Sequence, residues 1–294
     1  MAIHGVIPAM LTPFDANGKV DEAALRQYVE FLLARGVHGL FPCGTNGEGL
    51  LLSLEERKRV ATIVVEQVDG RVPVIVHTGA INTEQTIELT KHAKSIGADA
   101  VGVVAPYYFP HDDLCLEQHF LAVANSVPDL PVYLYNIPGN AKNSISPKLA
   151  SRLHKQCPNI AGIKDSSKDL NRLEEFIAAN DENFTVIVGT DSLVFPALAV
   201  GAAGVVSAVA NVFPEEVVKI YQYYSEGKIV EAKKQQYYVN KLRDALKMGP
   251  YITPYKEALR WRGMDVGGQR APLRPLTDLE KEKLWQALKD LHAL

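Results

Sequence analysis

The stretch Asn159-Ile160-Ala161-Gly162-Ile163-Lys164-Asp165-Ser166-Ser167 places a lysine at the end of a short apolar run. A continuous apolar run of this length is typical of a parallel strand that is buried on both faces. A cation at the end of such a strand is costly unless it reaches water, pairs with an acid or loses its proton. Lys164 is therefore either a lysine that extends to the surface beside Asp165, or a neutral amine that can attack a ketone. The stretch alone leaves both interpretations open.

The rest of the chain repeats a pattern in which a short apolar run precedes a helical segment. Runs that predict strands begin at Val6 and recur at 37–41, 72–77, 100–105, 132–135, 160–164, 185–188 and 204–207. Helical patterns lie between them, and Ser53 and Glu56 have the spacing of a capping box at the start of one. Eight strand-then-helix units over roughly 225 residues match an α/β fold of the (β/α)8 TIM barrel type. A doubly wound sheet is the alternative, but its dinucleotide-binding fingerprint is absent.

The C-terminal part of the chain has a different pattern. Helices are predicted at 231–247, 254–262 and 277–291, and the last opens with the capping box Thr277-Asp278-Leu279-Glu280. No linker-like or low-complexity segment separates this part from the barrel. We therefore expect a catalytic barrel at 1–225 and a C-terminal helical region at 226–294 packed on it.

Composition narrows the class of protein. The 294 residues are 47% hydrophobic and 22% charged with a formal charge of -3, which gives no electrostatic reason to expect nucleic acid or a membrane as partner. No apolar run approaches a membrane span, and residues 1–5 lack the regions of a signal peptide. Cys43, Cys115 and Cys157 are an odd number without close pairing, which suggests neither a disulfide framework nor a zinc site. We expect a cytoplasmic protein.

Residues at the C-terminal ends of barrel strands converge on one place, and this is where barrel active sites lie. The residues in such positions are Gly44-Thr45-Asn46-Gly47-Glu48, Tyr107-Tyr108, Tyr135-Asn136, Lys164, Gly189-Thr190-Asp191 and Val206-Ser207. The glycine-flanked turn is neither a P-loop nor a dinucleotide motif, but its free amides suit a carboxylate or phosphate. Glycine-rich turns and strand-end tyrosines are also common structural features. Together, however, a neutral lysine, a phenol and an alcohol would supply a nucleophile, a proton carrier and a relay for imine formation on a 2-oxo acid.

Three of these motifs resemble the dihydrodipicolinate synthase / N-acetylneuraminate lyase family of class I, Schiff-base-forming pyruvate aldolases. They are Gly44-Thr45-Asn46-Gly47-Glu48, Tyr135-Asn136-Ile137-Pro138 and Gly162-Ile163-Lys164-Asp165, and the resemblance covers nearly the whole chain. It implies that Lys164 forms an imine with pyruvate or a pyruvate-derived 2-oxo acid and that Tyr135 shuttles the proton. Thr45 would link Tyr135 to a second tyrosine, Tyr108, supplied by a neighbouring subunit. A homotetramer built from dimers is expected.

The resemblance also implies how a small-molecule 2-oxo acid would be held. The substrate-binding candidates are Thr45, Asn46, Gly47, Gly189, Asp191, Val206 and Ser207. Thr45 and Asn46 would hold the pyruvyl carboxylate, whereas Asp191 and Ser207 resemble positions that sugar-acid lyases use for hydroxyls. No metal or organic cofactor is implied, because the covalent imine through Lys164 carries the chemistry. His77 lies at a strand end, and a core histidine accounts for it better than a metal ligand.

The second substrate is the property in which members of this family differ. Dihydrodipicolinate synthases typically carry an arginine two residues after the proline of the tyrosine motif, whereas Pro138 is followed here by Gly139-Asn140. The synthases also usually have threonine where this chain has Asn46. The sequence therefore predicts an aldolase that cleaves a 2-oxo-4-hydroxy acid, such as 2-keto-3-deoxygluconate or 4-hydroxy-2-oxoglutarate, to pyruvate plus an aldehyde. The alternatives are 4-hydroxy-tetrahydrodipicolinate synthase, N-acetylneuraminate lyase and a noncatalytic barrel with an interaction or regulatory role.

Overall fold

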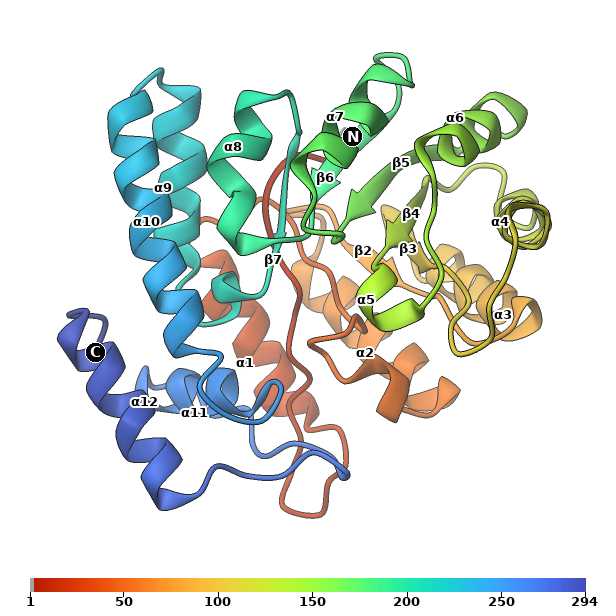
Figure 1. Ribbon diagram of the computed structural model, residues 1–294. Helices are drawn as coiled ribbons and strands as arrows, with labels where there is room; N and C mark the ends of the chain where they lie inside the picture. The colour runs from red at the N-terminus through yellow and green to blue at the C-terminus, as the bar shows by residue number, and fades with distance from the viewer. Residues whose placement is uncertain (1–2) are drawn as a thin grey trace.

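The computed structural model describes residues 3–294, which form a curled parallel sheet surrounded by helices (Figure 1). Seven strands follow the order β1-β7-β6-β5-β4-β3-β2, so that each strand after β1 lies beside its neighbour in the sequence. The strands are β1 Gly5–Pro8, β2 Ile75–His77, β3 Ala100–Val104, β4 Val132–Asn136, β5 Ile160–Asp165, β6 Thr185–Val188 and β7 Gly204–Ser207. The predicted α/β class with a parallel sheet is confirmed.

The second predicted strand is the exception, and the prediction of eight regular strands is wrong there. The segment 37–41 is irregular and makes a single parallel bridge, from Leu40 to Val74. Its backbone N–H groups donate to the carbonyls of Val6 and Pro8 in β1 and of Pro73 beside β2. The segment therefore connects the two edge strands of the sheet. Prolines have no N–H to donate, and those at 42 and 73 interrupt a regular ladder at this place.

Helices follow the strands as the sequence pattern predicts. They are α1 Glu22–Leu33, α2 Leu54–Val68, α3 Thr83–Ser95, α4 Asp113–Asn125, α5 Pro138–Ala141, α6 Pro147–Gln156, α7 Leu170–Ala178, α8 Val194–Ala199 and α9 Pro214–Ser225. Short 3-10 turns lie at Gly49–Leu51, Asp191–Leu193 and Val209–Asn211. The capping box at Ser53 and Glu56 is confirmed, with both reciprocal hydrogen bonds present.

The C-terminal region is helical, as predicted. It contains α10 Ile229–Ala245, α11 Thr253–Trp261 and α12 Asp278–Asp290, and the capping box at Thr277 is confirmed. α10 packs beside α9, and α12 contacts both α10 and α11 (Figure 1). One cluster of buried apolar side chains includes residues from the strands, the surrounding helices and these C-terminal helices. No helix within residues 3–294 is long and apolar enough to cross a membrane. The division at 225 and 226 stays a prediction.

The two faces of the sheet bury different sets of side chains. Val6 and Ile163 belong to the cluster under the surrounding helices, whereas Ile7, Ile187 and Val206 belong to a smaller cluster on the inner face. Successive side chains of a strand point to opposite faces. Because Ile163 faces the helices, the next residue, Lys164, is directed into the interior of the curled sheet.

Candidate active site

Lys164 lies on the inner face of β5, and its side chain is buried. The residue is 5% exposed, and its Nζ lies 3.8 Å from the centroid of the Tyr135 ring and 4.3 Å from that of Phe41. Burial lowers the pKa of Lys164 from 10.5 to about 7, although the charge of Asp191 acts in the opposite direction. Roughly half of the amine is therefore neutral at pH 7. The interpretation of Lys164 as a surface lysine is wrong.

Asp165, the other residue in that interpretation, has its own partners. It is buried, and its carboxylate accepts hydrogen bonds from Asn136 Nδ2 at 2.7 Å and from Ser167 Oγ at 2.6 Å. Asn136 Oδ1 in turn accepts from the backbone N–H of Ile145 at 2.9 Å. Asp165 therefore ties β5 to β4 and to the segment before α6, and it does not neutralise Lys164.

The register of the sheet brings Tyr135 next to Lys164. Tyr135 in β4 pairs directly with Lys164 in β5, so the two side chains share the inner face. The Tyr135 hydroxyl lies 3.2 Å from Thr45 Oγ1, within hydrogen-bond distance. Burial raises the pKa of Tyr135, and the hydrogen bond with Thr45 partly offsets this effect. A nucleophile, a phenol and an alcohol are thus brought together as expected.

Thr45 and Asn46 reach the site on the glycine-flanked turn. Cys43 and Glu48 on either side of it adopt left-handed backbone angles, with φ of 62° and 55°. A Cβ added at Gly47 would lie 2.8 Å from the carbonyl oxygen of Met10, so this close approach requires glycine. Gly47 is buried and does not line the cavity, and its predicted role in substrate binding stays a prediction.

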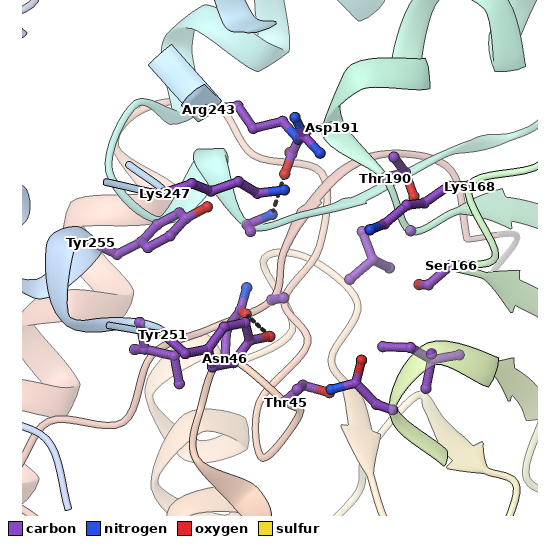
Figure 2. Close-up of a pocket in the computed structure, with 18 of the residues that line it drawn as sticks. Thr45, Asn46, Ser166, Lys168, Thr190, Asp191, Arg243, Lys247, Tyr251 and Tyr255 are labelled. Carbon is purple, nitrogen blue, oxygen red and sulfur yellow. Dashed lines mark hydrogen bonds between the residues drawn. The ribbon is translucent and has the colours of Figure 1, made fainter. Parts of the chain in front are cut away.

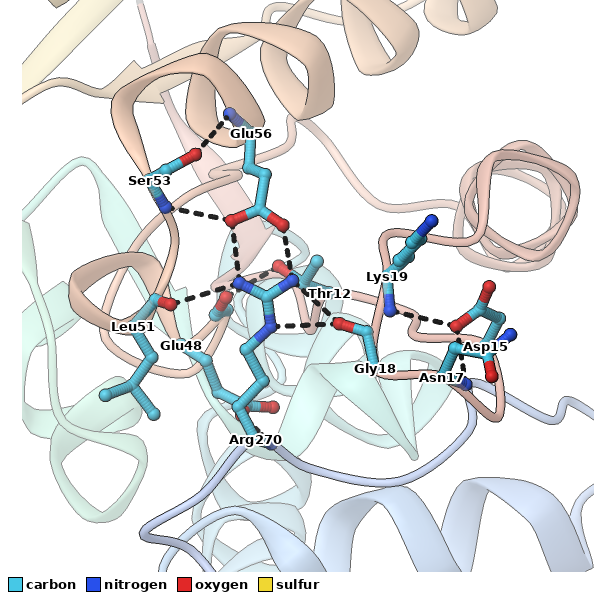
Figure 3. Close-up of polar contacts among 11 residues, drawn as sticks. Thr12, Asp15, Asn17, Gly18, Lys19, Glu48, Leu51, Ser53, Glu56 and Arg270 are labelled. Carbon is cyan, nitrogen blue, oxygen red and sulfur yellow. Dashed lines mark hydrogen bonds and ion pairs between the residues drawn. The ribbon is translucent and has the colours of Figure 1, made fainter.

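Buried and partly buried ion pairs hold this turn against the C-terminal region (Figure 3). The Glu48 carboxylate pairs with Lys256 Nζ at 2.8 Å, both side chains being almost fully buried, and accepts from the backbone N–H of Arg270 at 2.7 Å. The Arg270 guanidinium donates to Glu56 and to the carbonyl oxygens of Gly18 and Leu51. Segments far apart in the sequence therefore fix the position of Thr45 and Asn46.

The site opens into a cavity of about 540 Å³. Of the predicted residues, those that line it are Thr45, Asn46, Tyr135, Lys164, Gly189, Asp191 and Val206. Ser207 does not line the cavity, since it is fully buried and donates to Asp191 Oδ1 at 2.5 Å. The Asp191 carboxylate also accepts from the backbone N–H groups of Ala208 and Val209, and burial raises its pKa. Ser207 thus orients Asp191.

Tyr108 is the one predicted catalytic residue that lies away from the cavity. Its side chain is 77% exposed, it has a positive φ of 81°, and its ring packs edge-on against Phe109. Its neighbour Tyr107 lines a smaller cavity of about 140 Å³ together with Thr45 and Tyr135. The role of Tyr108 across a subunit interface stays a prediction.

Comparison with known proteins decides the family. Residues 2–291 match the family described as the dihydrodipicolinate synthetase family. This chain belongs to that family. It is 45% identical to an uncharacterized DapA-like lyase of Halobacterium salinarum, over 100% of this chain and 96% of the relative. It is 40% identical to the 4-hydroxy-tetrahydrodipicolinate synthase of Thermus thermophilus, over 96% of this chain and 94% of that enzyme. Among solved structures, YagE of E. coli K12, in complex with pyruvate, matches with a TM-score of 0.96 at 32% identity, covering all of both chains.

Membership of the dihydrodipicolinate synthetase family makes the chain a carbon–carbon lyase. Several residues that line its cavity were not among the predicted ones. They are Asn140 and, labelled in Figure 2, Ser166, Lys168, Arg243, Lys247, Tyr251 and Tyr255. Ser166 and Lys168 follow β5 closely, and the strand-end rule could have found them. Arg243, Lys247 and the two tyrosines come from the C-terminal region, where no local motif marks a residue as part of a site.

Proposed function

We propose that this family member is a Schiff-base aldolase that reversibly cleaves a 2-oxo-4-hydroxy acid to pyruvate and an aldehyde. The observation that carries the proposal is the buried Lys164 amine, with a pKa of about 7, beside the hydrogen-bonded pair of Tyr135 and Thr45. A neutral amine is what nucleophilic attack on a ketone requires.

The steps assign a task to each side chain. The neutral Lys164 amine attacks C2 of the 2-oxo acid, and loss of water leaves a protonated imine. Tyr135 carries protons in this step, with Thr45 as its hydrogen-bonded relay. Removal of the C4 hydroxyl proton, also by Tyr135, lets the C3–C4 bond break, with its electrons moving into the imine to give an enamine. Protonation at C3 and hydrolysis release pyruvate, and no metal or organic cofactor enters the sequence.

The cavity lining supports a substrate other than aspartate semialdehyde. Asn140 lines the cavity at the position where the synthases typically carry an arginine, so a neutral amide stands in place of their carboxylate anchor. Asp191 also lines the cavity, and its carboxylate oxygens could accept a hydrogen bond from a substrate hydroxyl. We infer 2-keto-3-deoxygluconate-like acids or 4-hydroxy-2-oxoglutarate as substrates. The second candidate, 4-hydroxy-tetrahydrodipicolinate synthase, is favoured by the names of relatives that are 39% to 41% identical.

A direct comparison of substrates tests this proposal. Pyruvate release from 2-keto-3-deoxygluconate and from 4-hydroxy-2-oxoglutarate would be followed with lactate dehydrogenase, and compared with condensation of pyruvate and aspartate semialdehyde. We expect kcat/KM to be higher for cleavage. Condensation at a rate far above both cleavage reactions would replace the proposal with the synthase.

We further propose that the protein is a cytoplasmic homotetramer built from dimers. Tyr108 supports this assembly, because its exposed ring packs against the exposed ring of Phe109, and together they give an apolar surface that an identical subunit could cover. In such a dimer Tyr108 would complete the relay of Thr45 and Tyr135 in the neighbouring subunit.

A further inference from the structure

Three cationic side chains gather at the outer part of the active-site cavity. Lys168 follows β5, Arg243 lies near the end of α10, and Lys247 comes just after that helix; all three line the cavity. Figure 2 shows Arg243 and Lys247 on one side of the opening, with Lys168 reaching toward them from the other. Residues more than 70 positions apart in the sequence thus place positive charge at one site.

These charges have little compensation from the protein. Within residues 3–294, Lys168 and Lys247 make no ion pair, and Arg243 pairs only with its neighbour Asp244, at 3.1 Å. The Asp244 side chain is 72% exposed, so this pair is weak. Burial lowers the pKa of Lys247, and the charges of Arg243 and Lys168 lower it further. The three cations therefore repel one another, and a bound anion would relieve this repulsion.

One acid, Asp191, offsets only part of this charge. Asp191 is the one acidic residue among the described residues that line the cavity. Its two oxygens accept hydrogen bonds from Ser207 Oγ and from the backbone N–H groups of Ala208 and Val209. Asp191 is thus held by the turn after β7. Its charge partly offsets the effect of burial, which lowers the pKa of Lys247, but three cations line the cavity with this one carboxylate, so an excess of positive charge stays.

We propose that Lys168, Arg243 and Lys247 form an anion subsite for the far end of the substrate. This inference rests on the proposed function, in which Lys164 holds the pyruvyl part at the inner end of the cavity. The aldehyde partner then carries a carboxylate or a phosphate, and a neutral polyhydroxy aldehyde is a poorer substrate. Of the two substrate types proposed above, the subsite favours the dicarboxylic one. Aspartate semialdehyde is disfavoured by Asn140, and not by a lack of positive charge in the cavity.

The test compares molecules that differ only in the distal charge. Imines of the protein with the diacids 2-oxoglutarate and 2-oxoadipate would be trapped with borohydride. The matched monoacids are 2-oxopentanoate and 2-oxohexanoate, which have the same numbers of carbons as these diacids, in this order, and no second carboxylate. We expect the concentration of a diacid that gives half-maximal trapping to be about tenfold lower than that of the matched monoacid, because its second carboxylate gains a charge-assisted hydrogen bond. Condensation of pyruvate with D-glyceraldehyde 3-phosphate and with D-glyceraldehyde gives the phosphate comparison. A preference confined to one comparison assigns the anion as carboxylate or phosphate.

Variants show whether these cations cause the preference. Arg243→Met and Lys247→Met should each reduce the ratio of half-saturating concentrations, and the triple variant with Lys168→Met should abolish it. Lys241→Met removes an exposed cation from the same helix that does not line the cavity, and should leave the ratio unchanged. Two results would overturn the inference. One is that diacids and monoacids reach half-saturation at the same concentration and the phosphorylated aldehyde is not preferred. The other is a preference that survives in the triple variant. Absence of any imine with pyruvate in the wild type would instead reject the proposed function.

Discussion

Removing the buried amine of Lys164 should stabilise the fold while abolishing catalysis. Lys164→Met keeps an unbranched side chain of similar length among the Phe41 and Tyr135 rings and removes the group that burial penalises. The pKa of Lys164 is about 7 in the folded protein and 10.5 for an ordinary lysine. Each unit of difference corresponds to about 1.4 kcal/mol.

The sign of the effect follows from proton binding. Between pH 7 and pH 10.5 the unfolded chain binds a proton at Lys164 that the folded protein does not, so the wild type gains stability as pH rises. The variant lacks this group. It should exceed the wild type in free energy of unfolding by about 4 kcal/mol at pH 7, and by about 2 kcal/mol at pH 9.

Urea unfolding at a fixed protein concentration, followed by far-ultraviolet circular dichroism at both pH values, measures these differences. Lys241→Met, an exposed lysine on α10, is the matched control and should change neither value appreciably. A Lys164→Met variant that is no more stable than the wild type, or whose advantage does not shrink between pH 7 and pH 9, would refute the account of a desolvated amine.

Other predictions concern the relay, the turn and the assembly. Tyr135→Phe keeps the ring but loses the hydroxyl that contacts Thr45, and kcat should fall by about 10²–10⁴-fold; a nearly normal kcat would remove Tyr135 from the mechanism. Lys256→Met leaves the Glu48 carboxylate buried without its counter-charge and should lower the free energy of unfolding, measured with urea, by about 3–5 kcal/mol. The double variant Lys256→Met with Glu48→Gln removes both charges, and its free energy of unfolding should fall by less. Equal losses in the two variants would contradict this. Light scattering should give the mass of four chains, and a fully active single chain would argue against a role for Tyr108 between subunits.

Much of the site could be predicted because it depends on local rules. The apolar run 160–163 predicted the strand, and its end marked Lys164 as a candidate site residue. In the structure Ile163 packs under the helices, so Lys164 faces the interior of the sheet. The convergence of Tyr135 and Lys164 was expected because both lie at the C-terminal ends of parallel strands, and the register of β4 and β5 pairs them directly. The sequence motif at 44–48 marked a turn whose close packing against Met10 requires glycine.

The features that sequence reasoning missed depend on long-range contacts. Ser207 resembled a substrate ligand, but its position directly behind Asp191 depends on how the turn after β7 folds back. The segment 37–41 has a strand-like composition, and neighbouring prolines reduce it to a single bridge. Arg243 and Lys247 reach the cavity only because α10 packs against α9 and ends near the strand ends, which no local pattern indicates.

The central claim is that Lys164 forms an imine with pyruvate. Incubation of the protein with pyruvate and borohydride, followed by peptide mapping with mass spectrometry, tests it most directly. We predict a reduced pyruvyl adduct on Lys164 in the wild type and none in Lys164→Met. A folded wild-type protein that gains no mass, or that carries the adduct on a different lysine, would contradict the account.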